Sequence, residues 1–512
     1  MNRKHPDRPE FNVPSEGTAF KFAKTVIAIA LSTSALWTVC PVNAAIWTPV
    51  NSQDWNDGGN WTGGVVPGTG ATAVIDVSGL QGPVLSNSNN GVLDLLSVGE
   101  LGSGSLKIDV NGQLLAANAQ VAATSGFNSR IDLNSPAAVL SVADALAVGL
   151  AGTGVLSIQG GIVGSNSLAV GVIQGADGSV TLSGANSRLS VLQSVVLGVS
   201  GAGHLQVESG AQATVGVVTV GANPTGVGDV SVTGPSLLTA NSLRIGDKGP
   251  GSFTVSNGGA VVAKASSSFI GRNSFQNQLM VDGKGSLLDL ANLSVGSQGN
   301  GTLVVSSAGV AKLNALIVGQ FAGSSGSVIV TGAGSTLNAI TGLTVGRSGI
   351  GSMSILDSAN VSTDIVTLAE DAGTVGTLTV DGHGSMLQAS GMEVGASGAG
   401  VLNLSNGAVL SINKQVLSYG ILNSHEPGSS GTINIGAVPG GQPVAPGVID
   451  TKLIRFGDGN GTLNFNHSAS SYSFDPEISG LGTVNHLAGV TAMTHDSSGF
   501  MNRPGFHGGR LV

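Results

Sequence analysis

"NLSVGSQGNGTLVVSSAGV" runs over Asn292–Val310, and the chain writes nearly the same phrase again and again. It returns as "GLTVGRSGIGSMSILDSANV" at Gly342–Val361 and as "GMEVGASGAGVLNLSNGAVL" at Gly391–Leu410. In the first copy, Leu293 and Val295 alternate with polar residues, a period of two that is typical of β-strands. Glycine, asparagine and serine fill the stretches between the apolar pairs and supply turns. The phrase therefore predicts short strands joined by tight turns.

The spacing of the phrase is nearly constant. The glycine that closes each "L-x-V-G" stands at Gly99, Gly149, Gly198, Gly246, Gly296, Gly346 and Gly395, in steps of 48 to 50 residues. A related register falls near the middle of the interval, at Gly171, Gly221, Gly271 and Gly319. The structural unit is therefore about 24 residues, used twice per repeat. Such a regular array predicts one stacked body and not a series of separate domains.

A unit of this length accommodates three short strands and three turns. If each unit forms one coil, equivalent positions in successive coils stack about 4.8 Å apart. The sequence thus predicts an all-β fold, a parallel β-helix (solenoid) with coils of about 24 residues. About fourteen coils would cover residues 92–437 and span roughly 65 Å. Leucine and valine would point inward, and serine, threonine and asparagine outward.

The first 44 residues are predicted to be a secretory signal peptide. Five Lys and Arg residues precede or border the apolar stretch Thr25–Val39, which is shorter than the about 20 residues that span a membrane. Small residues at Val42–Ala44 offer a cleavage site after Ala44. The alternative is a retained N-terminal anchor.

Composition excludes several function classes for the rest of the chain. After residue 44 it carries 26 acidic and 15 basic side chains, so it repels phosphate backbones and nucleic acid is not an expected partner. Cys40, the single cysteine, lies in the leader. The remainder therefore has no thiol for a disulfide, a nucleophile or a soft metal.

Both ends of the repeat array differ from its middle. Residues 45–91 are predicted to form an N-terminal cap, because an open solenoid end exposes core and unpaired strand. They contain Trp47, Trp55 and Trp61, which favour a packed cap, with a carbohydrate-binding aromatic cluster as the alternative. Residues 438–500 begin with a Pro/Gly-rich loop or linker and return to strand-like text, and residues 501–512 are an off-pattern tail.

No acidic pair is placed for catalysis. Asp282 and Asp381 hold equivalent positions but stand 99 residues apart, about four coils or roughly 19 Å. The doublet Glu370-Asp371 is predicted to be a solvated turn. Asp54 and Asp57, near the tryptophans, are the best remaining cluster, and turn bonding or capping is favoured over a catalytic role.

The sequence also predicts no cofactor or metal site. The histidines after the leader are scattered, at His204, His383, His425, His467, His486, His495 and His507. No HExxH motif or close histidine pair occurs, and no P-loop is present. "GDGNGTLNF" at Gly457–Phe465 resembles calcium-binding glycine-aspartate repeats, but it occurs once, with one aspartate. The predicted sets of catalytic, cofactor-binding and metal-binding residues are therefore empty.

Taken together, these units resemble the repeat shared by the passenger regions of type V autotransporters and certain exported bacterial surface proteins. The resemblance rests on the "VGSQGNGTLVVSSAGV"-type units, on "DWNDGGNW" followed by "VVPG", and on residues 461–500, and it covers residues 46–500. It implies Gram-negative export, a right-handed β-helix and an adhesive surface role toward glycans or proteins.

One feature departs from that family. Autotransporters end in a β-barrel of about twelve strands, each of roughly ten residues, whereas 32 residues follow Gly480 in this sequence. The departure predicts a truncated or frameshifted gene or a short secreted form, placed at the cell surface or outside, or in the periplasm. The expected function is a non-catalytic structural or adhesion-type module. The alternatives are a carbohydrate-active β-helix enzyme (a polysaccharide lyase or hydrolase) and a non-functional autotransporter remnant.

Overall fold

A computed structural model describes residues 44–272, 276–412, 420–502 and 510–511. The predicted signal peptide lies outside these residues except for Ala44, and so does most of the predicted tail. Among the described residues, no helix is long and apolar enough to cross a bilayer.

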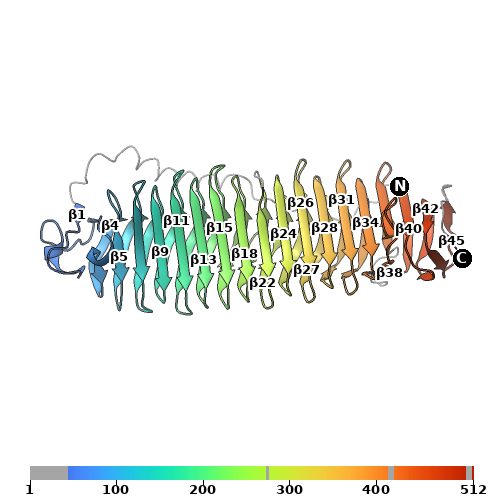
Figure 1. Cartoon of the computed structure of the whole chain (residues 1–512). Helices are drawn as coiled ribbons and strands as arrows, with labels where there is room; N and C mark the ends of the chain where they lie inside the picture. Colours follow the sequence, from blue (N-terminus) through green and yellow to red (C-terminus); the bar gives the residue numbers. More distant parts are fainter. Residues whose placement is uncertain (1–43, 273–275, 413–419, 503–509, 512) are drawn as a thin grey trace. The chain divides into compact units, whose positions relative to one another are not determined.

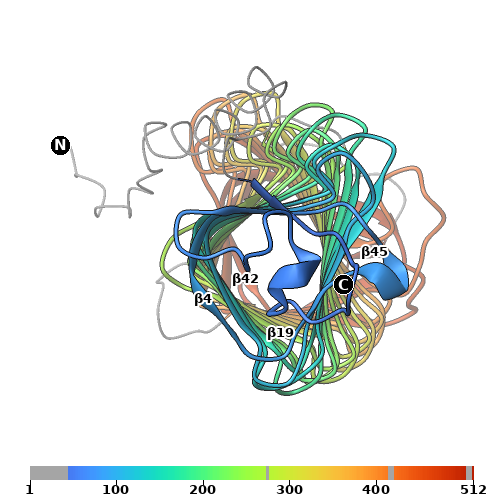
Figure 2. The ribbon, with the colours of Figure 1, turned by 90° about the vertical axis from the view of Figure 1, so that its left-hand side faces the viewer.

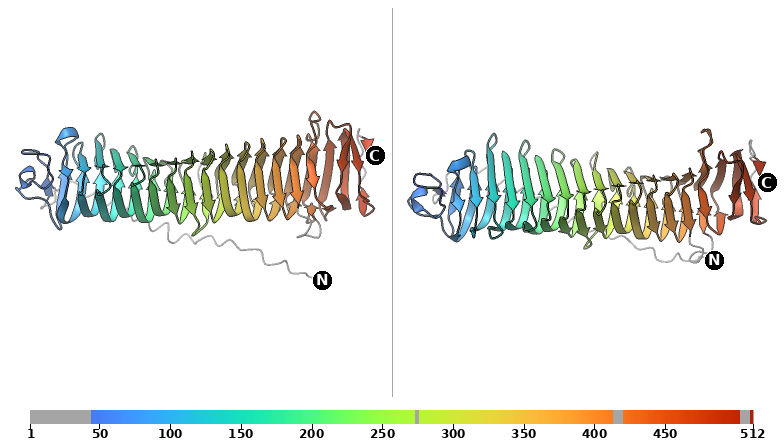
Figure 3. Two further views of the ribbon diagram at one scale, coloured as in Figure 1. Left: turned by 90° about the horizontal axis from the view of Figure 1, so that it is seen from below. Right: turned by 60° about the horizontal axis from the view of Figure 1, so that its bottom comes forward.

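The described chain winds into a parallel β-solenoid of about 17 turns with coils about 25 residues apart, which confirms the predicted fold class and repeat length. Figure 1 shows these coils stacked one beside the next in sequence order. Viewed along the stack, successive coils overlie one another (Figure 2). Within the stack, strands pair in parallel with the equivalent strands one coil before and one coil after, whereas strands at its ends have a partner on one side. Figure 3 shows the strands side by side in two further views.

The short-strand sheet contributes one strand per coil. Its members are β3 (Val84–Leu85), β5 (Ser105–Ile108), β7 (Asn128–Leu133), β9 (Thr153–Gln159), β11 (Asp177–Ser183), β13 (Ala202–Glu208), β15 (Val227–Thr233), β18 (Gly251–Ser256), β21 (Gln278–Asp282), β24 (Asn300–Ser306), β26 (Ser325–Thr331), β28 (Ile350–Leu356), β31 (Val375–Asp381), β34 (Ala399–Ser405), β37 (Ser430–Gly436), β40 (Asn460–Asn466) and the second half of β42 (Glu477–Ala488).

The long-strand sheet covers the other two sides of each coil. Eight of its strands run unbroken through both sides: β4 (Ser88–Val98), β6 (Gln113–Val121), β8 (Val139–Val148), β10 (Ile162–Val170), β12 (Arg188–Leu197), β14 (Gln212–Val220), β25 (Val310–Val318) and β27 (Thr336–Val345). In these coils a bulge bends one strand where the sequence predicted two, as between Ser165 and Ser167 in β10.

Elsewhere the same two sides are formed by separate strands. They are β16 (Leu237–Ala240) and β17 (Ser242–Ile245), β19 (Ala260–Ala263) and β20 (Ser268–Ile270), β22 (Leu287–Leu290) and β23 (Asn292–Val295), β29 (Asn360–Thr363) and β30 (Ile365–Leu368), β32 (Met386–Ala389) and β33 (Gly391–Val394), β35 (Val409–Ile412) and β36 (Ile421–Asn423), and β38 (Val448–Asp450) and β39 (Leu453–Phe456).

The remaining elements lie at the two ends. β1 (Ala44–Ile46) and β2 (Thr72–Ile75) start the long-strand sheet, with the 3-10 turns η1 (Gly58–Asn60) and η2 (Gly79–Gln81) beside them. β41 (Tyr472–Phe474), β43 (Val490–Met493) and β45 (Arg510–Leu511) form a small parallel sheet, and β44 (Phe500–Asn502) pairs with β42.

The core is a column of aliphatic side chains that follows from the period of two. Leu303, Val328, Met353 and Leu378 pair in register on successive short strands, and each is at most 1% exposed. Val304 faces outward between two buried neighbours, as the alternation predicts. Burial of such a column stabilises a coil only when the neighbouring coils seal both of its faces.

The ladder continues through both predicted boundaries of the repeat array. β2 pairs with β4, and β37 pairs with β40 over seven residues. The Pro/Gly-rich passage between Gly436 and Val448 is a loop that lies along the neighbouring coils, because Asn406 N donates to Ala445 O at 2.8 Å and Ser468 N donates to Val444 O at 2.9 Å.

Candidate functional site

The three tryptophans after the leader are packed inside the N-terminal end. Trp47, Trp55 and Trp61 are each at most 2% exposed. The Trp61 ring meets the other two edge to face, with ring centroids 5.1 Å from Trp47 and 4.7 Å from Trp55. Its Nε1 donates to Trp55 O at 2.8 Å. Rings buried in this way present no face for a sugar to stack on, so the cluster acts as the packed cap and not as the carbohydrate platform.

Asp54 and Asp57 bind backbone amides in the turns of this cap. The Asp57 carboxylate accepts from Gly59 N at 2.9 Å and caps η1. Asp54 Oδ1 accepts from Asn56 N at 3.0 Å. Between them the buried amide of Asn60 accepts from Asn51 N and donates to Ser52 Oγ, which ties the loop together. Both carboxylates thus have local structural partners.

The other acidic residues singled out by sequence also bond to the coil next to their own. Asp282 accepts from Ser306 Oγ at 2.7 Å, and Asp381 accepts from Ser405 Oγ one coil on. Glu370 lies 3.8 Å from Arg347 Nε in the preceding coil. Asp371, beside it, accepts from Ser348 Oγ. Each of these four carboxylates therefore has a partner in the neighbouring coil.

Among the described residues, no three or more His, Cys, Asp and Glu side chains gather around a point that could hold a metal. Asp458 of the glycine-rich "GDGNGTLNF" is an exposed turn residue ahead of β40. The structure does bring His467 and His486 together, with ring centroids 6.4 Å apart. The histidines look scattered along the sequence, and their spacing did not predict this contact.

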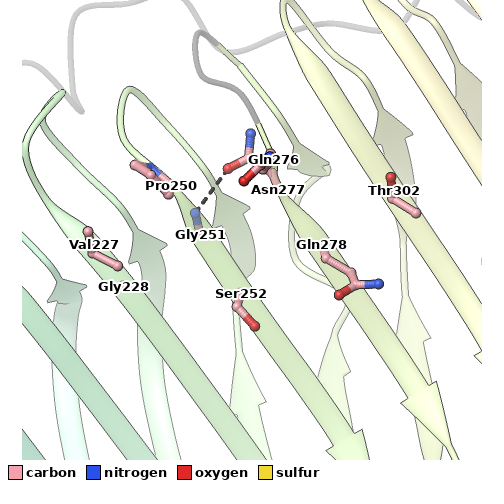
Figure 4. Close-up of a pocket in the computed structure, with 9 residues that line it drawn as sticks. All are labelled: Val227, Gly228, Pro250, Gly251, Ser252, Gln276, Asn277, Gln278 and Thr302. Atoms are coloured by element: carbon pink, nitrogen blue, oxygen red, sulfur yellow. Dashed lines mark hydrogen bonds between the residues drawn. The ribbon is translucent and has the colours of Figure 1, made fainter.

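A groove lies on the outer surface of the short-strand sheet. It has a volume of about 370 Å³ and crosses the strands β15, β18, β21 and β24. Nine residues line it: Val227, Gly228, Pro250, Gly251, Ser252, Gln276, Asn277, Gln278 and Thr302. Figure 4 shows Ser252, Gln278 and Thr302 on successive strands, with Pro250 and Gln276 at one end.

The groove lies where the repeat departs from its rule. Neighbouring coils place a glycine, Gly251 or Gly301, at the start of the short strand, and this coil places Asn277 there. The Asn277 side chain is buried and replaces a backbone link: its Oδ1 accepts from Gly251 N, and its Nδ2 donates to Asn300 O, both at 3.0 Å. Gln276 before it has a φ of +57°, which is uncommon for a residue with a Cβ.

The lining of the groove determines what chemistry it can perform. None of the nine lining residues ionises near neutral pH, so the groove has no general acid, general base or charged nucleophile. It offers hydroxyl and amide groups from Ser252, Thr302, Gln276 and Gln278 beside apolar Val227 and Pro250. These groups suit an uncharged ligand that both donates and accepts hydrogen bonds.

The sequence holds a signal for the groove that the average repeat length conceals. The interval from Gly251 to its counterpart Asn277 is 26 residues, and that from Asn277 to Gly301 is 24. Asn277 also carries an amide side chain where both of these neighbours are glycine. A search for coils that break the glycine register would have found two positions, Ser129 and Asn277, and the groove lies at the second of them.

Comparison with known proteins gives a narrow result. No family model matches this chain. A stretch of 112 residues is 37% identical to part of the uncharacterized lipoprotein YdeK of Escherichia coli strain K12. The match covers 20% of this chain and 8% of that relative, so the chain spans only a small part of the relative's length. The chain is thus similar over about four coils to a segment of a much longer bacterial protein named as a lipoprotein.

Proposed function

We propose that this protein is an exported β-solenoid of the autotransporter-passenger type that serves as a structural or adhesion-type module, at the cell surface or secreted, without catalytic activity. The observation that carries the proposal is the character of the outer surface: its acidic residues singled out above are engaged in turn and inter-coil bonds, and its groove is lined by uncharged groups. A long, regular exterior of this kind suits binding over an extended face.

Two further observations support export. The leader has the basic, apolar and small-residue order of a signal peptide, and the similar segment of YdeK belongs to a protein named as a lipoprotein, a class held at the envelope. An acidic chain whose sequence after residue 44 has no cysteine also fits an exterior role that does not depend on disulfides.

Export is tested by expressing the full chain in a Gram-negative host and determining the N-terminus of the recovered protein. We expect processing after Ala44, with the product in the envelope or the medium. Leu31→Arg places a charge in the apolar stretch and should leave the protein unprocessed in the cytoplasm, whereas Leu31→Val should export normally. An unprocessed cytoplasmic product from the unaltered gene would contradict the proposal.

Binding and catalysis are separated by a second experiment on residues 45–512. The purified protein is applied to immobilised neutral polysaccharides and cell-surface proteins, and each polysaccharide is then analysed for cleavage. Gln278→Arg fills the groove with a long charged side chain and should weaken binding at least tenfold for a ligand held there. Ser352→Arg, at the equivalent outward position two coils beyond Thr302, is the matched control. Cleavage products from any polysaccharide would overturn the non-catalytic assignment.

A further inference from the structure

The C-terminal coils enclose two histidines that no proposed function uses. His486 lies in β42, in register with Phe465 of β40, and His467 directly follows β40. The two side chains therefore belong to consecutive coils. His467 and His486 are 0% and 1% exposed, respectively, in a chain whose ionisable side chains are otherwise mostly at its surface.

Aromatic rings form the walls of this histidine pocket. The His486 ring stacks on Phe465 with centroids 5.2 Å apart, and the His467 ring lies 5.1 Å from Tyr472. On another side the backbone is pressed against His467: a Cβ on Gly489 would lie 2.3 Å from its Nδ1. A pocket packed this tightly leaves an imidazolium ion without the solvation that it has in water.

Hydrogen bonding does not replace that solvation. His467 Nε2 lies 2.8 Å from Thr491 Oγ1. His467 Nδ1 and both ring nitrogens of His486 have no hydrogen-bond partner in the described part of the chain. A charged imidazole needs an acceptor for each of its two N–H groups, so the pocket suits the neutral form of both rings.

The surrounding elements supply no compensating negative charge. β37, β40 and β43 contain no ionisable side chain, and β41 contributes Tyr472, whose pKa is raised by burial and whose hydroxyl donates to Gly447 O. In β42 the carboxylate is Glu477, nine residues from His486 at the opposite end of the strand. Two nearby exposed groups, Asp475 and His495, lie 3.2 Å from each other. Among the described residues, no carboxylate forms an ion pair with either buried histidine.

We propose that the pair formed by His467 and His486 is a pH-sensitive latch that holds the last coils of the solenoid closed at neutral pH and opens them on acidification. Protonation of either ring places a cation in an apolar pocket, and a second proton would add repulsion between the two rings. Opening of β40, β42 and β43 lets both rings reach water and take up protons.

The sign of the effect follows from the direction in which burial moves each pKa. Burial is the largest cause and lowers the pKa of both histidines below 6.5. The backbone of Ala469 opposes this shift at His467, and the neighbouring His467 lowers the pKa of His486 further. The opened state therefore binds more protons than the closed state once the pH falls below about 6.5. The stabilisation is present above that pH and is lost as the pH falls toward the lowered values. A histidine that binds its proton about tenfold more weakly in the closed state can shift the opening equilibrium about tenfold.

Amide hydrogen exchange measured by mass spectrometry on residues 45–512 at pH 7.5 and pH 5.0 tests the latch. After correction for intrinsic exchange rates, peptides from residues 460–493 should lose protection at least about tenfold at pH 5.0. Peptides from residues 325–356, in the middle of the stack, should keep theirs. Equal protection of residues 460–493 at both pH values in the unaltered protein would overturn the proposal without any variant.

Variants assign the effect to the two rings. His486→Phe preserves stacking on Phe465 and removes no hydrogen bond, so it should reduce the pH response, and combined with His467→Gln it should abolish the response. His383→Phe, at an exposed turn, should behave like the unaltered protein. A double variant that still loses protection at pH 5.0 would sink the proposal. If that variant does not fold, NMR titration of the two histidines in the unaltered protein tests the proposal. A pKa of 6.5 or above for both imidazoles would overturn it.

Discussion

The glycine that ends each L-x-V-G phrase is required by backbone geometry. All eleven glycines of the two registers have a positive φ: Gly99, Gly149, Gly171, Gly198, Gly221, Gly246, Gly271, Gly296, Gly319, Gly346 and Gly395. At most of them an added Cβ would also collide with the following coil. The spacing read from the sequence is therefore the spacing of one obligatory corner, which is why it located the coils so well.

A comparison of two glycines separates strain from collision. Gly296 has a φ of +67°, and its Cβ would lie 2.3 Å from Ser325 O, whereas Gly323 has a φ of +80° and open space around it. We expect Gly323→Ala to destabilise by about 1–2 kcal/mol through backbone strain alone. Gly296→Ala should cost about 1–3 kcal/mol more, because the next coil has to shift.

The measurement is the free energy of opening from native-state hydrogen exchange in the coils around each position. Equal effects of the two substitutions would show that the corner is strained but not crowded. Ala122, Ala369 and Ser424 already occupy positive-φ positions at the same corner of other coils, so a Cβ is tolerated there when the neighbouring coil accommodates it. The glycine rule alone could not reveal these three exceptions, because accommodation depends on the coil that follows.

Among the elements, the last short strands carry a feature that strand periodicity could not predict. Asn403, Asn434, Asn464 and Asn485 stand in register on β34, β37, β40 and β42. Each side-chain amide donates to the carbonyl oxygen of the preceding one, at 2.7 to 2.9 Å. Asn434 and Asn464 are buried although they point away from the aliphatic column. The amide ladder fixes the register of these coils from outside the core.

Removal of one rung should be costly. Asn464→Ala leaves the side-chain carbonyl of Asn434, which is buried, and the side-chain amide of Asn485, which is partly buried, without their partners. We expect a loss of about 1–3 kcal/mol, mainly from the buried carbonyl. Thr432→Ala, an outward position on β37, should change stability by less than about 0.5 kcal/mol. Exchange protection of residues 460–493 at pH 7.5 measures both. Indistinguishable variants would mean that the ladder contributes nothing.

The N-terminal cap makes the next prediction. Trp61 contacts both other rings and donates to the backbone of Trp55, so Trp61→Ala should cost about 3–5 kcal/mol and open the cap. Limited proteolysis should then cut within residues 44–75 while far-UV circular dichroism of the remaining coils persists. Val65→Ala, at an exposed position, serves as the control. Retention of protease resistance in Trp61→Ala would show that the rings do not hold the end closed.

The sequence predicted those features of the elements that are set within one strand, and it did not predict those set by contacts between coils. Alternation fixed which residues of a short strand face the core, because that depends on the strand itself. Whether two sides of a coil form one bent strand, as in β10, or two, as in β16 and β17, depends on bulges shared with neighbouring coils. The burial of His467 and His486 also arises from contacts between coils, and composition gave no sign of it.

At the scale of the molecule, the stability of the solenoid is approximately the sum of the stabilities of its coils and of the contacts between neighbouring coils. Leu303 and Val328 are register partners in successive coils. Deletion of residues 303–327 joins Thr302 to Val328, which then takes the place of Leu303, so one whole coil is removed. We expect a folded protein with similar circular dichroism, shorter by about one strand spacing of 4.8 Å. Deletion of residues 303–314 brings the long-strand sheet into the place of the short one and should abolish cooperative unfolding. Small-angle scattering and thermal melts distinguish the two, and equal tolerance of both deletions would refute the coil as the unit.

The direction of the hydrogen bonds, from each coil to the next, has a mechanical consequence. A force applied to the two chain ends loads these bonds one coil at a time. The solenoid therefore unfolds coil by coil and not all at once at a single unfolding force. With coils of about 25 residues, each step releases roughly 80–90 Å of chain. A solenoid of this design responds to a sudden force by lengthening, and the coils that have not yet unfolded stay intact.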